Sequence, residues 1–201
     1  MIKSHLSKTA IAVLLCSMYA GGAYAALVVQ VVDSAGQPVA DAVVYAEGAA
    51  ALLKSPPPAE VAQKNKKFMP LVTVVQIGTA INFPNNDTVR HHAYSFSAPK
   101  PFDIKLYSGT PSSPIVFDKA GTVVVGCNIH DQMIAYIQVV DTPFFAKTDA
   151  AGMARLNNIV PGKYALKTWH YKQAAGIPVN EQSISYKDDA AITVKLNYKT
   201  S

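Results

Sequence analysis

Short apolar runs alternate with turn residues along most of this chain. The runs are rich in Val, Ile and aromatic residues, and Gly, Pro, Asn and Asp separate them, as is typical of strands joined by turns. We find no amphipathic helical pattern after the first 25 residues, so the chain is predicted to be all-β. The predicted strands cover residues 27–32, 42–45, 71–75, 80–83, 93–96, 115–117, 122–125, 134–140, 164–169 and 192–196.

The first 25 residues have the three parts of a secretory signal. Lys3 and Lys8 are basic, the apolar run over 11–19 is too short to cross a bilayer, and residues 23–25 (Ala-Tyr-Ala) match a small-x-small cleavage site. No later stretch of the sequence is long and apolar enough to predict a membrane span. We therefore expect a signal peptide over 1–25 and a periplasmic protein.

Proline divides the rest of the chain. Residues 51–66 include a Pro-Pro-Pro run, which favours extended chain and blocks ladder hydrogen bonds, so this segment is predicted to be a linker. Residues 67–142 form one predicted unit, and residues 26–50 and 143–201 together form a second unit that the first one splits. The roughly 175 residues after the signal are many for one small sandwich, although one enlarged sandwich with extra strands is the alternative.

The turns of the split unit resemble those of small prealbumin-like sandwiches, which occur as accessory domains beside carboxypeptidases. That family has a D-x-x-G-x-P turn near its start, and later a T-D-x-x-G turn and a P-G-x-Y turn. Residues 33–38, 148–152 and 161–164 match these three turns in order. The resemblance implies that residues 26–50 and 143–201 fold into one small β-sandwich.

Charge and motif content argue against several classes of function. The formal net charge is +5, and removal of Lys3 and Lys8 with the signal would leave +3. The lysines are scattered or in short clusters such as 64–67, and no basic stripe alternates with aromatic residues, so no nucleic-acid partner is predicted. No Ser-His-Asp order, glycine-rich phosphate loop or pair of carboxylates stands out, and we do not expect an enzyme.

Cys127 would be the sole cysteine after cleavage, because Cys16 lies in the signal. A lone thiol in an exported protein cannot form an internal disulfide and is open to oxidation. It is therefore either a buried apolar residue or a thiolate held by a metal. His130 and Met133 favour the metal, because a thiolate, two imidazoles and a thioether form the ligand set of a mononuclear copper site. The second imidazole would come from another strand.

Residues 83–92 and 121–133 resemble cupredoxins of the plastocyanin and amicyanin type. In that family a strand ends in F-x-N-N, a copper-binding histidine follows, and a glycine-led strand delivers the cysteine of a C-x-x-H-x-x-M loop. Residues 91–97 and 127–131 also resemble exported bacterial proteins labelled methylamine-utilisation proteins. The resemblance implies a cupredoxin-like Greek-key β-sandwich over 67–142, one type 1 copper ion, and an electron carrier with a transient redox protein partner.

The resemblance also implies the ligands of that copper ion, which are His91, Cys127, His130 and Met133. Counting from Phe83 in the family pattern selects His91 as the upstream ligand. Strand alternation instead favours His92, which shares the more apolar face of its strand with Tyr94 and Phe96. We predict His91, with His92 as the alternate, because a motif count tolerates a β-bulge better than strand parity does.

Other functions are compatible with the same residues. A copper chaperone or storage protein could use the same ligands, and a cell-envelope binding module could work through the split sandwich, with the copper site as an accessory. For an electron carrier, the exposed edge of His130 beside Ile129 is the predicted electron port. His170 is predicted to be a structural histidine, and Asp87 is predicted to form a turn.

Overall fold

A computed structural model describes residues 26–48, 55–174, 177–188 and 190–200. Within these ranges the chain consists of strands, turns and irregular segments, which confirms the all-β prediction. The predicted signal peptide over 1–25 lies outside the described residues, as do residues 51–54 of the predicted linker. Among the described residues, no helix has the length and hydrophobicity that a bilayer crossing requires.

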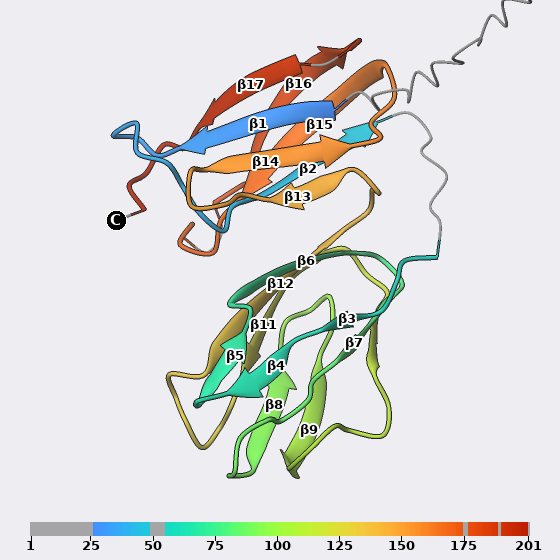
Figure 1. Cartoon of the computed structure of the whole chain (residues 1–201), viewed down its shortest axis with the longest axis vertical. Coiled ribbons are helices and arrows are strands. Elements are labelled where there is room, and N and C mark those ends of the chain that lie inside the picture. The colour runs from blue at the N-terminus through green and yellow to red at the C-terminus, as the bar shows by residue number, and fades with distance from the viewer. Residues whose placement is uncertain (1–25, 49–54, 175–176, 189, 201) are drawn as a thin grey trace, which may run out of the picture.

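Two sheets combine strands from both ends of the described chain (Figure 1). Their orders are β14-β1-β17 and β13-β2-β15-β16, and they enclose a core that includes Leu27, Val44, Leu156 and Leu166. We call this part the terminal sandwich. Its strands are β1 (Ala26–Val32), β2 (Val43–Gly48), β13 (Phe145–Lys147), β14 (Met153–Asn157), β15 (Gly162–Trp169), β16 (Asn180–Tyr186) and β17 (Ala190–Lys195).

The strands between β2 and β13 form separate sheets, which we call the inserted sandwich. A five-stranded sheet of order β6-β12-β11-β8-β9 packs against a three-stranded sheet of order β10-β7-β3, and β4 and β5 form a hairpin. Ile81, Phe117, Val123 and Ile137 belong to their common core. The strands are β3 (Ala59–Glu60), β4 (Ala62–Lys64), β5 (Lys67–Met69), β6 (Val72–Gln76), β7 (Thr79–Asn82), β8 (His91–Ser95), β9 (Phe102–Tyr107), β10 (Ile115–Phe117), β11 (Gly121–Gly126) and β12 (Ile134–Val140).

The end of the predicted linker forms strands instead. β3 pairs in parallel with β7, and β4 pairs antiparallel with β5. Val61 and Gln63 are fully buried, whereas Glu60 and Lys64 are exposed, so side chains in this segment alternate between core and solvent. The linker therefore ends before Ala59, and residues 59–64 belong to the inserted sandwich.

The terminal sandwich covers part of one face of the five-stranded sheet. The Tyr136 ring of β12 lies 6.1 Å from the Trp169 ring and 5.2 Å from the Tyr171 ring, measured between centroids. Lys147 Nζ donates a hydrogen bond of 3.1 Å to the Val72 carbonyl across this interface. The terminal sandwich thereby covers β6 and the C-terminal part of β12, whereas Ile134 at the start of β12 stays exposed. The buried interface residues are Val43, Tyr45, Val72, Val140 and Trp169.

Candidate metal centre

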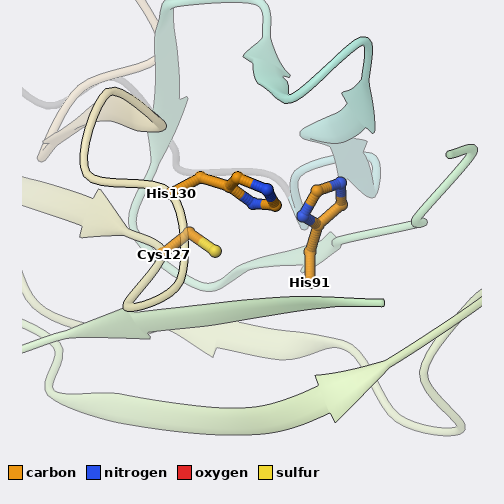
Figure 2. A group of neighbouring side chains, drawn as sticks. All are labelled: His91, Cys127 and His130. Atoms are coloured by element: carbon orange, nitrogen blue, oxygen red, sulfur yellow. The ribbon is translucent and has the colours of Figure 1, made fainter. Parts of the chain in front are cut away.

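Three side chains from two places in the sequence meet at one end of the inserted sandwich (Figure 2). His91 is the first residue of β8, Cys127 directly follows β11, and His130 lies in the loop that joins β11 to β12. One ligand atom from each residue lies within 4.8 Å of the other two. Antiparallel pairing of β11 with both β8 and β12 brings the segments together. The fold thus places a thiol beside two imidazoles.

Two nitrogen atoms in this group are buried without a hydrogen-bond partner. They are Nδ1 of His91 and Nδ1 of His130. His91 and Cys127 are themselves buried, and His130 is half-buried. An unpaired buried nitrogen costs about 1–3 kcal/mol, a cost that metal coordination would remove. Two free imidazole nitrogens beside a thiol fit an ion that accepts mixed nitrogen and sulfur ligands, such as copper.

Asp87 holds the His91 ring from the other side. The His91 Nε2 atom lies 2.7 Å from Asp87 Oδ2, so Nε2–H donates to the carboxylate and Nδ1 stays free as a ligand atom. The carboxylate also accepts backbone N–H groups from Asn65, at 2.6 Å, and from Lys66, at 2.9 Å. Partial burial raises the pKa of Asp87, but the hydrogen bonds from Lys66, His91 and Asn65 together bring it below its usual value. Asp87, predicted only as a turn former, therefore links His91 to the β4–β5 turn.

His92 lies on the opposite face of β8, away from Cys127 and His130. Its Nε2 atom pairs with Asp103 of β9, and its ring centroid lies 5.2 Å from that of Tyr94, with the two rings tilted by 44°. The ladder between β8 and β9 shifts register between His91 and Ala93. The structure thus brings His91 into the cluster and leaves His92 at the surface of the sheet.

Strand parity pointed to His92 because it assumes that the more apolar face of a strand is the buried one. In β8 the buried positions are His91, Ala93 and Ser95. The larger rings of Tyr94 and Phe96 belong to the outer face, where Phe96 is 88% exposed. Parity is misleading here because the inner face of β8 carries small side chains and one polar ring.

Met133 ends the loop that contains Cys127 and His130. Its backbone N–H donates to the His130 carbonyl at 2.8 Å, which closes the turn, and its side chain is fully buried in the core of the inserted sandwich. Met133 and Cys127 also line the same surface hollow. These contacts place Met133 beside the loop of Cys127 and His130, and the role of its thioether as an axial ligand stays a prediction.

A hydrogen-bonded pair near the cluster was missed by the sequence analysis. The Gln63 amide donates to the Tyr107 hydroxyl, and this hydroxyl donates to the Phe83 carbonyl at 2.6 Å. Burial is the main cause that raises the pKa of Tyr107 to about 12. The hydrogen bond from Gln63 lowers this pKa, and the charge of Cys127 raises it further. Tyr107 therefore stays protonated and ties β9 to the end of β7. The polar residue Gln63 lay in the predicted linker, so no sequence signal marked it.

No protein-family model and no curated protein matches the chain, but solved structures do. A copper-containing nitrite reductase from Thermus scotoductus SA-01 is 28% identical over 56% of this chain, with a TM-score of 0.40, and the match spans only 28% of the reductase. A purple cupredoxin from Nitrosopumilus maritimus is 19% identical over 41% of this chain and 99% of its own, with a TM-score of 0.36. Amicyanin from Paracoccus versutus is 15% identical over 41% of this chain and 80% of its own, with a TM-score of 0.35. Because these TM-scores are low, we base the assignment of function on the site itself.

Proposed function

We propose that this chain is a periplasmic type 1 copper protein that carries one electron at a time. The observation that supports this most strongly is the meeting of the Cys127 thiol with two buried, unpaired imidazole nitrogens. Met133 would add a weak axial thioether. The signal predicted over 1–25 supports export, and a transient redox protein partner needs only a small contact surface.

The residues around the site favour electron transfer because they fix the ligands before a metal arrives. Asp87 orients His91, and strand pairing of β11 with β12 positions the loop of Cys127 and His130. A bound copper ion would supply a centre that alternates between its +1 and +2 states. Because the framework is buried and hydrogen-bonded, little of the protein has to move when an electron arrives or leaves.

The proposal is tested by visible absorption and spin-resonance spectra of residues 26–201 with one equivalent of copper(II). We expect an intense thiolate-to-copper band that ascorbate bleaches and ferricyanide restores. Cys127→Ser and His91→Ala should lose the band, whereas His92→Ala should keep it, because His92 faces away from the cluster.

Other results would favour the other functions. A copper chaperone would bind copper(I), lose it to a competing chelator and show no strong thiolate-to-copper band. If the Cys127→Ser variant binds copper as tightly as the wild type, the proposal is contradicted, because the thiolate is then not needed as a ligand. Retention of an unrelated ligand by Cys127→Ser would indicate a binding module.

A further inference from the structure

The part of the five-stranded sheet that the terminal sandwich leaves open carries a cluster of apolar side chains. We call this cluster the aromatic face, and it consists of Tyr94, Phe96, Val124 and Ile134. Phe96 is 88% exposed, Val124 and Ile134 are also exposed, and the Tyr94 and Phe96 rings lie 5.1 Å apart. Exposed apolar side chains that occur singly are ordinary, but a contiguous group marks an interaction site.

The aromatic face adjoins the candidate metal centre. Its four residues line a hollow of about 480 Å³ that Cys127 and Met133 also line. Gly126, which pairs with Tyr94 across the strands, has no side chain to separate the Tyr94 ring from the backbone. A Cβ atom at position 126 would lie only 3.2 Å from this ring. Tyr94 therefore contacts the main chain one residue before the thiol.

The aromatic face is also continuous with the interface between the two sandwiches. Val124 lines a second hollow, of about 420 Å³, together with Tyr136 and Trp169 of that interface. One part of this face of the sheet thus already packs against the terminal sandwich, and the neighbouring part is open to solvent. Of the residues that line the first hollow, Asp131 is the only charged one. The surface suits an apolar partner that carries few charges.

The edge of His130 is less suited to docking. Within the loop 127–133, Ile129 is the one large apolar side chain that is exposed, at 46%, and its loop neighbours are polar. A single exposed apolar residue is common on protein surfaces. The aromatic face therefore offers more contiguous apolar surface for docking than the edge of His130 does.

We propose that a redox protein docks on the aromatic face through an apolar, weakly charged surface, with Phe96 at the centre of the contact. This inference rests on the proposed function. In the docked complex one electron passes from the reduced copper site to an oxidised one-electron centre of the partner. No bond forms or breaks in this chain and no proton moves, and Tyr94 and Gly126 supply the short path between Cys127 and the partner.

The test uses copper-loaded residues 26–201 on gold covered with a methyl-terminated hexanethiol monolayer, which is an apolar and uncharged surface. Phe96→Ser removes the centre of the aromatic face, Ile129→Ser removes the apolar residue beside His130, and Val116→Ser, 45% exposed on the opposite sheet, is the background control. We expect Phe96→Ser to weaken adsorption on the order of tenfold and to slow interfacial electron transfer. The other two variants should match the wild type, and all should keep the thiolate-to-copper band.

The outcomes separate this inference from the proposed function. If Ile129→Ser slows electron transfer and Phe96→Ser does not, the docking surface is wrong while the copper site stands. If the wild type takes up no copper, the proposed function fails. The surface can still be tested in that case, because the adsorption of the metal-free wild type can be compared with that of metal-free Phe96→Ser. We expect the wild type to sediment as a monomer. A dimer that Phe96→Ser dissociates would assign the aromatic face to a second copy and overturn the inference.

Discussion

At the scale of single residues, the candidate site depends on which nitrogen of His91 is free. His91 Nε2 donates a hydrogen bond to Asp87, whereas Nδ1 has no hydrogen-bond partner. Nδ1 is therefore the His91 atom that is available to a metal held with Cys127 and His130. A family motif count could select His91 from the sequence, because such a count needs only local spacing. The role of Asp87 could not be found in this way, since it depends on the position of the β4–β5 turn in the folded chain.

Replacement of Asp87 tests its role as a positioning residue. Asp87→Ala should weaken copper binding about 10–100-fold, because His91 Nε2 loses the acceptor that orients the ring. The matched control is Asp103→Ala, which breaks the corresponding contact of His92 on the outer face of the same strand. Competition with a chelator of known affinity measures both. Equal weakening in the two variants would show that the Asp87–His91 contact has no special part in the site.

At the scale of elements, the predictable strands are the apolar ones. Runs of β-branched residues mark β1, β11 and β12 in the sequence, and the structure has strands there. Several strands were missed, and β9 and β16 are the two longest of them; both are edge strands of their sheets. An edge strand can carry few apolar residues and several charged or polar ones, and hydrophobicity then does not reveal it. In β16, for example, exposed Glu181, Ser183 and Ser185 alternate with half-buried residues.

Two matching turns of the terminal sandwich allow a controlled test of local packing. In each turn an aspartate accepts two backbone N–H groups and a glycine with positive φ follows, at Asp33 and Gly36 and at Asp149 and Gly152. A Cβ atom at Gly36 would meet nothing within 4 Å, whereas one at Gly152 would lie 2.5 Å from the Val31 carbonyl oxygen. The two glycines thus share the same backbone requirement but differ in their surroundings.

We expect Gly36→Ala to lower the free energy of unfolding by about 1–2 kcal/mol, which is the cost of a left-handed backbone for a residue with Cβ. Gly152→Ala should cost about 1–3 kcal/mol more, because the methyl group pushes β1 away from the turn. Urea denaturation followed by circular dichroism measures both values. Equal losses would mean that the turn at Gly152 shifts without affecting β1.

At the scale of the whole molecule, one sandwich is inserted into the sequence of the other, between β2 and β13. The order of turn residues in the sequence suggested a split unit, and the structure shows sheets that combine strands from both ends of the described chain. The contact between the sandwiches could not be predicted, because its residues come from runs that look like ordinary core strands. Val72 and Val140 face the terminal sandwich rather than the core of their own sandwich. The nested arrangement leaves the β8–β11 side of the sheet open.

His170, which follows the interface residue Trp169, should make the stability of the molecule depend on pH. Burial is the main cause that lowers the pKa of His170 to about 4. The positive charge of Lys172 lowers this pKa further, and the negative charge of Asp41 raises it. The unfolded chain, with an ordinary histidine pKa of about 6.5, therefore binds the proton more readily than the folded chain. The free energy of unfolding should fall by roughly 2–3 kcal/mol as pH drops from about 7 to about 4.

The variant His170→Gln isolates this effect from the titration of carboxylates over the same range. Its pH dependence between about 4 and 6.5 should be flatter than that of the wild type by the amount that His170 contributes. Urea denaturation at a series of pH values gives both curves. Parallel curves would show that His170 has the same proton affinity in the folded and unfolded chain.

The central claim is that Cys127, His91 and His130 hold one copper ion that carries one electron. The most direct test is a coulometric titration of copper-loaded residues 26–201, with the thiolate-to-copper band recorded at each potential. We predict that one electron per chain is taken up and returned, and that the band disappears and reappears with it over repeated cycles. Copper loss on reduction, or a band that does not follow the charge, would contradict the account.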